Sequence, residues 1–378
     1  MRRQILAPLI GLLLIGCGQP TAQPSPTASP RHTPTPTPSP TPAPPPAPLP
    51  PPPSLPPAGG IHLVAGFSAY VYGQGLGTIT AMAYGPDGRL YVLTAGGSIE
   101  VVPSPGARPQ LLVAGLPVAL GLAWRGPDLY VSVRGSVRAY HLTGGGLSGG
   151  GSVVSGLPVG RHQNDWIASM PNGDFLLGVG STCDVCNERD SRSAAVLRFH
   201  ANWTYAGVAL RGTRNPYGLA VRPSTDDAYV TINGQDNLGG QPADHMLRVN
   251  GGDAGWPRCW PAYPDGSLHG NCGGVARPIA VFTPHTSADG IVFYDGREFG
   301  AGYAENVFVT EWGTNGGGPA GRRVVRVVLS GSGETEHGQV SDFATGFSHP
   351  LGIVVARDGG LLVGDYGTGQ ITEIFRTS

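Results

Sequence analysis

The chain has 378 residues, of which 61 are glycine and 38 are proline, and only 13% of its residues are charged. Its 24 basic and 25 acidic residues give a net charge of −1, which provides no surface for a polyanion, so nucleic acid is not an expected partner. All the basic residues are arginine, and the absence of lysine excludes Schiff-base and lysine-nucleophile chemistry.

The first 17 residues have the form of a bacterial lipoprotein signal peptide. Two arginines precede an apolar stretch over residues 5–15, which is too short to span a bilayer, and LIGC (14–17) has the form of a lipobox. We therefore expect cleavage before Cys17 and a lipid on its sulfur. The protein would then be exported and would contact the membrane only through this anchor, at the extracytoplasmic face of the cell envelope. An ordinary cleaved signal peptide with a chance cysteine is the alternative.

Residues 18–59 form a tether that is rich in proline, serine, threonine and alanine. Such a sequence cannot build a core and favours extended polyproline conformations, at roughly 3 Å per residue. We expect a disordered spacer between the anchor and the globular part. A ligand for a proline-binding module is the less favoured interpretation.

Residues 60–378 contain six copies of one phrase: a small-apolar run, a turn, a short β-branched strand, glycine and a further strand. The copies cover residues 79–102, 119–140, 165–199, 216–249, 286–328 and 350–375. A unit of roughly 40–50 residues built from strands and turns is typical of a β-propeller blade. The sequence therefore predicts an all-β, six-bladed β-propeller over residues 60–378. A β-sandwich or a β-helix fits this repeat length poorly.

Residues 61–72 alternate apolar and polar side chains as a strand does, yet they precede the first complete repeat. The last repeat runs to residue 375, close to the end of the sequence. We expect this leading strand to complete the last blade and so to close the ring.

Two insertions, over residues 180–195 and 234–284, interrupt the repeats and are candidates for a binding surface. Outside the cytoplasm an even number of cysteines favours disulfides, and the pairing that is local in sequence joins the two cysteines within each insertion. A zinc site is the alternative, but C-x₂-C followed by C-x₁₂-C lacks a second close pair. A thioredoxin-like role is weaker still, because no βαβ pattern surrounds C-D-V-C. The four cysteines are Cys183, Cys186, Cys259 and Cys272.

Four phrases in the middle of the chain occur in the order typical of one family. They are GLPVGRHQNDWIASMPNG (156–173), RNPYGLAVRP (214–223), GGDAGWP (251–257) and HTSADGIVFYDG (285–296). Together they resemble the soluble glucose/sorbosone dehydrogenases, which are six-bladed quinoproteins that use pyrroloquinoline quinone (PQQ) and calcium. Three further phrases are closest to the sorbosone-type branch: GSTCDVCNE (180–188), INGQDNLG (232–239) and DFATGF (342–347). The resemblance extends over essentially all of residues 60–378.

The resemblance implies a sugar dehydrogenase that oxidises an aldose or a related sugar aldehyde at C1. Hydride would pass to PQQ with the assistance of calcium, and the electrons would leave to a respiratory or soluble acceptor. His162 aligns with the catalytic base of the family, and a histidine, with an ordinary pKa of about 6.5, suits that step. Without the resemblance, a loop histidine with a structural hydrogen bond would be the favoured interpretation of His162.

The resemblance also assigns the residues around the cofactor. Arg214 and Asn215 align with the pair that hydrogen-bonds the quinone, where the guanidinium would stabilise negative charge. The same residues could simply open a strand after a turn. Gly234 and Gln235 align with main-chain carbonyl ligands of calcium, which prefers oxygen. Asp236 and Asp244 could assist a cation or anchor their loop.

The sequence departs from the family at two points. The family holds its acidic cofactor with a lysine and with arginines of the fifth and sixth blades, whereas this chain has no lysine; Arg323 is our expected substitute, with Arg322 and His349 as other candidates. The acidic neighbour that precedes the catalytic histidine in the family is Arg161 here, and Asp165 is a possible replacement that orients the imidazole.

These departures leave two other functions open. The first is a non-catalytic propeller that has lost the quinone and binds a sugar, a peptide or a partner protein. The second is a calcium-dependent hydrolase of the lactonase-like propeller type, which would need several carboxylate and amide ligands converging on the axis.

Overall fold

The computed structural model describes residues 54–144, 146–314 and 320–377, which belong to one compact unit. Within these ranges no helix is long and apolar enough to cross a membrane. The expected signal peptide with Cys17, and residues 18–53 of the expected tether, lie outside the described residues and stay predictions.

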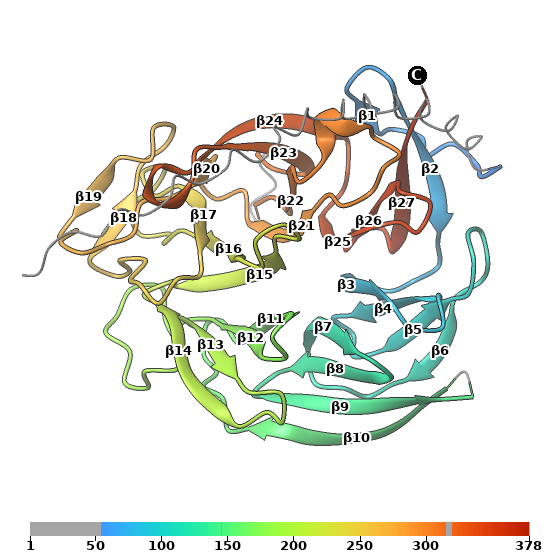
Figure 1. Ribbon diagram of the computed structural model, residues 1–378, viewed down its shortest axis with the longest axis horizontal. Coiled ribbons are helices and arrows are strands. Elements are labelled where there is room, and N and C mark those ends of the chain that lie inside the picture. Colours follow the sequence, from blue (N-terminus) through green and yellow to red (C-terminus); the bar gives the residue numbers. More distant parts are fainter. Residues whose placement is uncertain (1–53, 145, 315–319, 378) are drawn as a thin grey trace, which may run out of the picture. The chain divides into compact units, whose positions relative to one another are not determined.

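Six antiparallel sheets surround a central axis, so the predicted all-β, six-bladed propeller is confirmed (Figure 1). From β3 to β27, each blade begins with the strand nearest the axis, and the strands that follow in the chain lie progressively further out. The first blade consists of β3 (Ile79–Tyr84), β4 (Leu90–Thr94), β5 (Ile99–Val102) and β6 (Gln110–Val113). The second consists of β7 (Ala119–Arg125), β8 (Asp128–Val133), β9 (Ser136–Thr143) and β10 (Gly146–Ser155). The third consists of β11 (Asn164–Ser169), β12 (Phe175–Val179), β13 (Ala195–Phe199) and β14 (Tyr205–Arg211).

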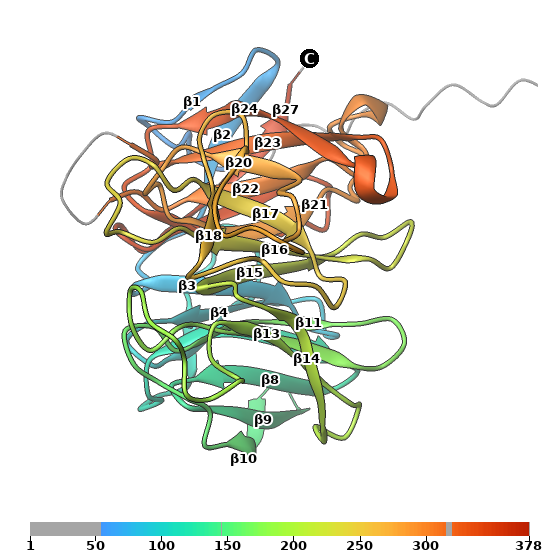
Figure 2. The same cartoon turned by 90° about the vertical axis from the view of Figure 1, so that its left-hand side faces the viewer.

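The second half of the ring follows the same plan, with an additional hairpin and two 3₁₀ turns. The fourth blade consists of β15 (Asn215–Val221), β16 (Ala228–Asn233), β17 (Asp244–Arg248) and β20 (Ala280–Phe282). The fifth contains β21 (Ala288–Phe293), β22 (Val307–Glu311), β23 (Arg323–Ser330) and β24 (His337–Thr345), and the sixth contains β25 (Pro350–Val355), β26 (Leu361–Asp365) and β27 (Gln370–Arg376). The 3₁₀ turns are Ala301–Tyr303 and Gly333–Thr335. The hairpin of β18 (Cys259–Pro261) and β19 (Leu268–Gly270) lies beside the fourth blade, which faces the viewer in Figure 2.

The ring is closed by strands that come before the first blade in the chain. β2 (Phe67–Gly73) pairs with β27 and places Val71 opposite Thr372, so the expectation that residues 61–72 complete the last blade is confirmed for β2. β1 (His62–Leu63) pairs instead with β24 at the edge of the fifth blade, which the sequence did not indicate. The leading segment thus joins two blades.

Glycines allow the innermost strands of neighbouring blades to approach each other. A Cβ on Gly218 of β15 would lie 2.1 Å from the carbonyl oxygen of Asp289 in β21. A Cβ on Gly290 would lie equally close, 2.1 Å, to the carbonyl oxygen of Leu351 in β25. The Gly-Leu and Gly-Ile pairs of the repeated phrase therefore mark the contacts that build the hub of the propeller.

Hydroxyl groups on the second strands connect one blade to the next. Ser132 Oγ donates to the carbonyl of Asn164 at 3.1 Å, and Thr310 Oγ1 donates to that of Leu351 at 3.0 Å. Thr231 Oγ1 donates to the carbonyl of Asp289 at 2.6 Å. Each bond runs from the second strand of a blade to the first strand of its successor, so the hub is fixed by hydrogen bonds as well as by packing.

Both predicted disulfides are present. Cys183 is bonded to Cys186 in the loop between β12 and β13, and Cys259 is bonded to Cys272 across the β18–β19 hairpin. The four sulfurs are therefore not available as thiolate ligands, which argues against the zinc alternative for this form of the protein. The C-D-V-C loop joins two antiparallel strands, β12 and β13, rather than a strand and a helix, which disfavours a thioredoxin-like role.

Candidate active site

A cavity of about 750 Å³ opens where the innermost strands of the third, fourth and fifth blades begin. Polar side chains dominate its wall, and four residues expected at the site from the sequence are among them. The described residues that line it are Arg161, His162, Arg214, Asn215, Asn233, Gly234, Asp236, Asp244, His285, Ser287, Gly313 and Thr314. The structure thus brings His162, Arg214, Asn215 and Gly234 together from segments far apart in the sequence.

Three residues of this wall have unusual backbone conformations. Arg214, His285 and Ser287 have φ angles of 52°, 60° and 51°, in the left-handed region that residues other than glycine rarely adopt. Each precedes or approaches an innermost strand, so the chain turns sharply as it enters the hub. Such conformations persist where the surrounding structure enforces them, and they are concentrated at functional sites.

His162 lies on the loop before β11, and Ser181 holds its imidazole. The His162 N–H donates to the Ser181 carbonyl at 3.0 Å, and His162 Nδ1 lies 3.0 Å from Ser181 Oγ. The Ser181 hydroxyl itself donates to the Cys183 carbonyl at 2.6 Å. Because its hydrogen is used there, Ser181 Oγ accepts from Nδ1–H, and we assign His162 the tautomer with a lone pair on Nε2.

His162 is uncharged near neutral pH. Burial of the imidazole, followed by the positive charges of Arg214 and Arg161, lowers its pKa to about 4. A neutral imidazole with a free Nε2 can accept a proton from a substrate hydroxyl. The arrangement therefore suits a general base.

Arg214 is 4% exposed and is surrounded by acceptors. Its Nη2 donates to Asp184 Oδ1 at 2.7 Å and to Asp236 Oδ2 at 3.0 Å, and its Nη1 donates to the Asn233 carbonyl at 3.3 Å. Its buried Nε has no hydrogen-bond partner among the described residues. The guanidinium is thus fixed in place and retains one donor that a ligand could use.

Asn215 lies next to His162 because of a glycine. A Cβ on Gly180 would be 2.3 Å from His162 Cβ and 2.6 Å from Asn215 Oδ1, so a side chain at position 180 would separate them. Asn215 Nδ2 donates to Asn233 Oδ1 at 2.8 Å. Its buried Oδ1 has no partner in the part of the chain that the structure describes. Both asparagines line the cavity.

Two carboxylates of the predicted calcium segment also line the cavity. Asp236 pairs with Arg161 at 2.5 Å as well as with Arg214, whereas Asp244 is buried and accepts from the Gly234 N–H at 2.8 Å. Burial raises the pKa of Asp244 to about 6. Asp244 therefore anchors its loop, as one of the two sequence interpretations expected. Gln235 is 3% exposed and is not among the residues that line this cavity.

Comparison with known proteins places this arrangement in context. No family model matches the chain. A protein of Borreliella burgdorferi described as uncharacterized is 24% identical over 235 residues, and the match spans 57% of this chain and 60% of that protein. Among solved structures, the PQQ domain of pyranose dehydrogenase from Coprinopsis cinerea superposes with a TM-score of 0.72 at 17% identity, over 86% of this chain and 99% of that one.

Two bacterial structures agree with that comparison. The PQQ-bound aldose sugar dehydrogenase of Streptomyces coelicolor has a TM-score of 0.63 at 21% identity, covering 83% of this chain and 99% of its own. A Thermus protein described as a putative glucose dehydrogenase has a TM-score of 0.67 at 22% identity, covering 82% and 100%. The chain has the fold of the soluble PQQ-dependent sugar dehydrogenases. At these identities the likeness concerns the fold, so the chemistry must be argued from the cavity itself.

The sugar-dehydrogenase fold does not bring every predicted residue to the cavity. Arg323, our expected substitute for the missing lysine, pairs with Glu311 at 2.6 Å and with Asp342 at 2.9 Å, and it is not among the described residues that line the wall. His349 stacks on Trp312 with ring centroids 4.0 Å apart, and it too lies outside that wall. The expectation for Arg323 is therefore not supported, because a carboxylate on the neighbouring strand binds its guanidinium.

Asp165 does not orient His162. It is 2% exposed, and its Oδ2 has no hydrogen-bond partner among the described residues. Burial, reinforced by the charge of Asp289, raises the pKa of the Asp165 carboxyl. The orienting group is Ser181, which the sequence patterns did not indicate. The sequence signal that could have indicated it is its place two residues before Cys183, the first cysteine of the Cys183–Cys186 pair.

Proposed function

We propose that the protein is a quinoprotein sugar dehydrogenase, which oxidises an aldose or a sugar aldehyde at C1 with PQQ as the acceptor and calcium as an assisting ion. The observation that carries the proposal is the neutral His162, whose Nε2 has no hydrogen bond to a described residue, in one cavity with the buried guanidinium of Arg214. The names of the structural neighbours, several of which specify PQQ or a sugar, support the same function.

The cavity residues fit a planar, polyanionic cofactor. The volume of about 750 Å³ lies within the range typical of small-molecule sites. Arg161 and Arg214 provide positive charge, while Arg214 Nε and Asn215 Oδ1 are buried polar atoms that lack partners among the described residues. Buried polar atoms normally have partners, so these two indicate space for a ligand.

The same wall offers oxygen ligands for calcium. Asp236 and Asp244 both line the cavity, and calcium prefers carboxylate and carbonyl oxygens. Gly234 lies in the same wall, and its carbonyl, with that of Gln235, remains the assignment implied by the resemblance.

PQQ, when bound, would supply a two-electron acceptor for the hydride of the sugar C1. His162 Nε2 would take the proton of the C1 hydroxyl, while Ser181 holds Nδ1–H and so keeps the basic nitrogen toward the cavity. The low pKa of His162 would then favour release of that proton to solvent. Arg214 would stabilise negative charge on an oxygen that faces its guanidinium.

Reconstitution of the full chain with PQQ and calcium chloride tests the proposal. We expect oxidation of aldoses coupled to an artificial dye, and a loss of about 10²- to 10⁴-fold in kcat for His162→Ala, because a general base contributes about that much. A spectroscopic titration should show that the variant still binds the quinone. His337→Ala, which changes an exposed histidine at the start of β24, is the matched control. Full activity of His162→Ala would remove this residue from the mechanism.

A binding propeller without the cofactor is the second candidate function. It is favoured by the absence of lysine, by the position of Arg323 and by the carboxylate of Asp236, which already pairs with both arginines of the cavity. Calorimetric titration with PQQ in the presence of calcium separates the two. No binding at micromolar concentration would favour the binding propeller. Hydrolysis of a lactone without the quinone would instead favour the calcium-dependent hydrolase.

We also propose that the protein is exported, anchored by a lipid on Cys17, and passes its electrons to a respiratory or soluble acceptor. The apolar segment and the lipobox of residues 5–17 support this location. Incorporation of labelled fatty acid by the wild-type protein, and its absence in Cys17→Ser, would test the anchor.

A further inference from the structure

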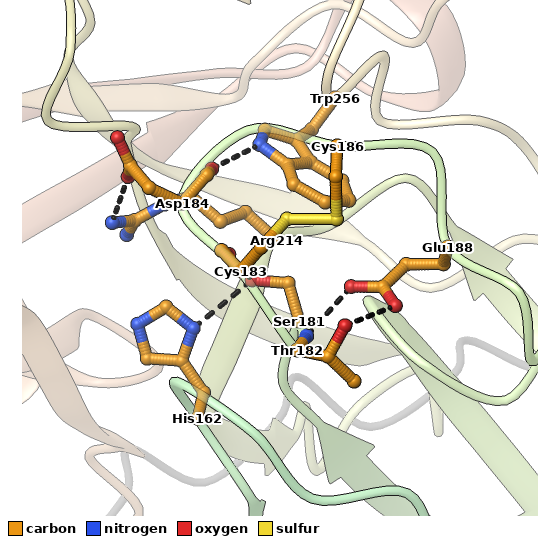
Figure 3. The surroundings of a disulfide bond; sticks show 9 residues. All are labelled: His162, Ser181, Thr182, Cys183, Asp184, Cys186, Glu188, Arg214 and Trp256. Atoms are coloured by element: carbon orange, nitrogen blue, oxygen red, sulfur yellow. Dashed lines mark hydrogen bonds and ion pairs between the residues drawn. A yellow bond between two sulfur atoms is a disulfide. The ribbon is translucent and has the colours of Figure 1, made fainter.

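We infer that the Cys183–Cys186 disulfide loop positions the two central groups of the cavity. Through Ser181 it fixes the tautomer of His162, and through Asp184 it holds the guanidinium of Arg214 (Figure 3). The consequence for catalysis rests on the proposed function, whereas the contacts themselves do not. Neither the sequence resemblance nor the fold assigns this loop a role.

The first half of the inference concerns Ser181, which is fully buried. Its N–H donates to the carbonyl of Arg214 at 2.6 Å, and its own carbonyl accepts from the His162 N–H. Its hydroxyl bonds the carbonyl of Cys183, one of the two linked residues. If this carbonyl moved away, the hydroxyl could turn and donate to His162 Nδ1, which would place the imidazole hydrogen on Nε2. That tautomer cannot act as a base toward the cavity.

The second half concerns Asp184, which lies between the two linked cysteines. Its Oδ1 accepts from Arg214 Nη2 at 2.7 Å and from the Asp236 N–H at 3.0 Å. Its carbonyl accepts from Trp256 Nε1 at 3.0 Å. The carboxylate is therefore bound to Arg214 whenever the loop keeps this shape.

The disulfide is what gives the loop a fixed shape. Residues 181–188 form no helix or strand, so regular backbone hydrogen bonds do not hold them. Thr182 binds Glu188 through its N–H at 2.6 Å and through its hydroxyl at 2.7 Å, which ties the base of the loop independently of the sulfurs. Removing the disulfide should therefore loosen Cys183 and Asp184 while the loop stays attached to the blade.

Nitrogen NMR of labelled histidine tests the inference without any enzymatic assay. In the wild-type full chain we expect His162 as the neutral Nδ1–H tautomer. In the double variant Cys183→Ser/Cys186→Ser, and in Ser181→Ala, we expect a mixture with the Nε2–H tautomer. The matched control is Cys259→Ser/Cys272→Ser, which also loses one disulfide but should leave the His162 signals as they are in the wild type.

Kinetics of the reconstituted protein provide the second readout. We expect kcat to fall by about 10- to 100-fold in Cys183→Ser/Cys186→Ser, since a displacement of reacting groups by about 1 Å has an effect of that size. If the double variant does not fold, as judged by circular dichroism, Ser181→Ala reports on the same contact with the disulfide intact. Unchanged His162 signals in the variants that fold would overturn the inference. The changed tautomer in a protein whose wild type oxidises no sugar would support the inference and refute the proposed function.

Discussion

At the scale of single residues, the protonation state of His162 depends in part on two arginines. Among the described residues, neither arginine forms a hydrogen bond with the imidazole, so they act through their charge. Burial lowers the pKa of the imidazole, and the charges of Arg214 and Arg161 lower it further, to about 4. The base is therefore ready over the whole neutral range, and its protonation becomes a limit only in acid. An exposed histidine would instead gain its proton at the ordinary histidine pKa of about 6.5.

This state predicts a definite pH profile. We expect kcat/KM of the reconstituted protein to be constant from about pH 8 to about pH 5 and to fall below that, as His162 gains a proton through its folded pKa of about 4. Arg161→Gln removes a positive charge that disfavours the imidazolium. The pKa of His162 should therefore rise, and the acid limb of the profile should move to higher pH. Circular dichroism at each pH would show whether the fold is intact. An acid limb near pH 6.5 that Arg161→Gln does not move would contradict the assignment.

The sequence identified part of this site and missed the rest for a physical reason. His162, Arg214 and Asn215 stand at the entrances of innermost strands, so the repeat pattern with the family resemblance was enough to place them together. Ser181 acts through a hydroxyl whose direction depends on the disulfide loop, which sequence patterns do not specify. Arg323 was misplaced because the strand register sets it directly opposite Glu311, and that register is visible only in the sheet.

At the scale of elements, one buried hydroxyl takes part in the contact between the fourth and fifth blades. Thr231 Oγ1 in β16 donates to the Asp289 carbonyl at 2.6 Å and accepts from the Gly218 N–H at 3.0 Å. Thr231 is fully buried. Removal of the hydroxyl would leave the Gly218 N–H and the Asp289 carbonyl without this partner in a buried interface.

Thr231→Val should therefore destabilise the propeller, by about 1–3 kcal/mol, because the change preserves shape but leaves buried polar groups unpaired. The thermal midpoint of the full chain, measured without cofactor, is the readout. Thr231→Ser keeps the hydroxyl and should lose much less stability. An unchanged thermal midpoint of Thr231→Val would contradict the role assigned to the hydroxyl.

The blades themselves were accessible from the sequence because they depend on local signals. Alternation of apolar and polar residues and the turn glycines repeat in each copy, and they predicted six blades and the closing role of β2. The pairing of β1 with the fifth blade was not accessible, since a strand of two residues has too few side chains to show a pattern. The β18–β19 hairpin, which lies inside an insertion, was not accessible for the same reason, because each of its strands has only three residues.

At the scale of the whole molecule, acidic side chains are buried in the sixth blade and beside it. Glu373 of β27 is fully buried, and neither of its carboxylate oxygens has a hydrogen-bond partner among the described residues. Burial, together with the charge of Asp358, raises its pKa to about 8. Glu298, which follows β21, has a pKa raised by burial to about 7. The folded protein therefore retains protons that the unfolded chain releases.

The sign of the resulting pH dependence follows from linkage. The unfolded glutamate loses its proton near its ordinary pKa of about 4.5, so stability falls as the pH rises from there to the folded value of about 8. Glu373→Gln should remove this loss and raise the thermal midpoint of the variant relative to the wild type at about pH 8.5, with little change near pH 5. Glu334→Gln, at an exposed position in a 3₁₀ turn, is the control. An identical difference at both pH values would refute the charge argument.

The pairing of β2 with β27 also has a consequence for biosynthesis. Its partner strands lie at opposite ends of the described chain, so β2 leaves the ribosome early and must wait for nearly the entire remaining sequence before it can pair. Until then the growing polypeptide carries two unpaired edges, of the kind that recruit other strands and aggregate. A protein of this architecture thus reaches its final topology in a single late step. A nascent chain lacking only its last ten residues would have five finished blades and a sixth blade that cannot pair with β2.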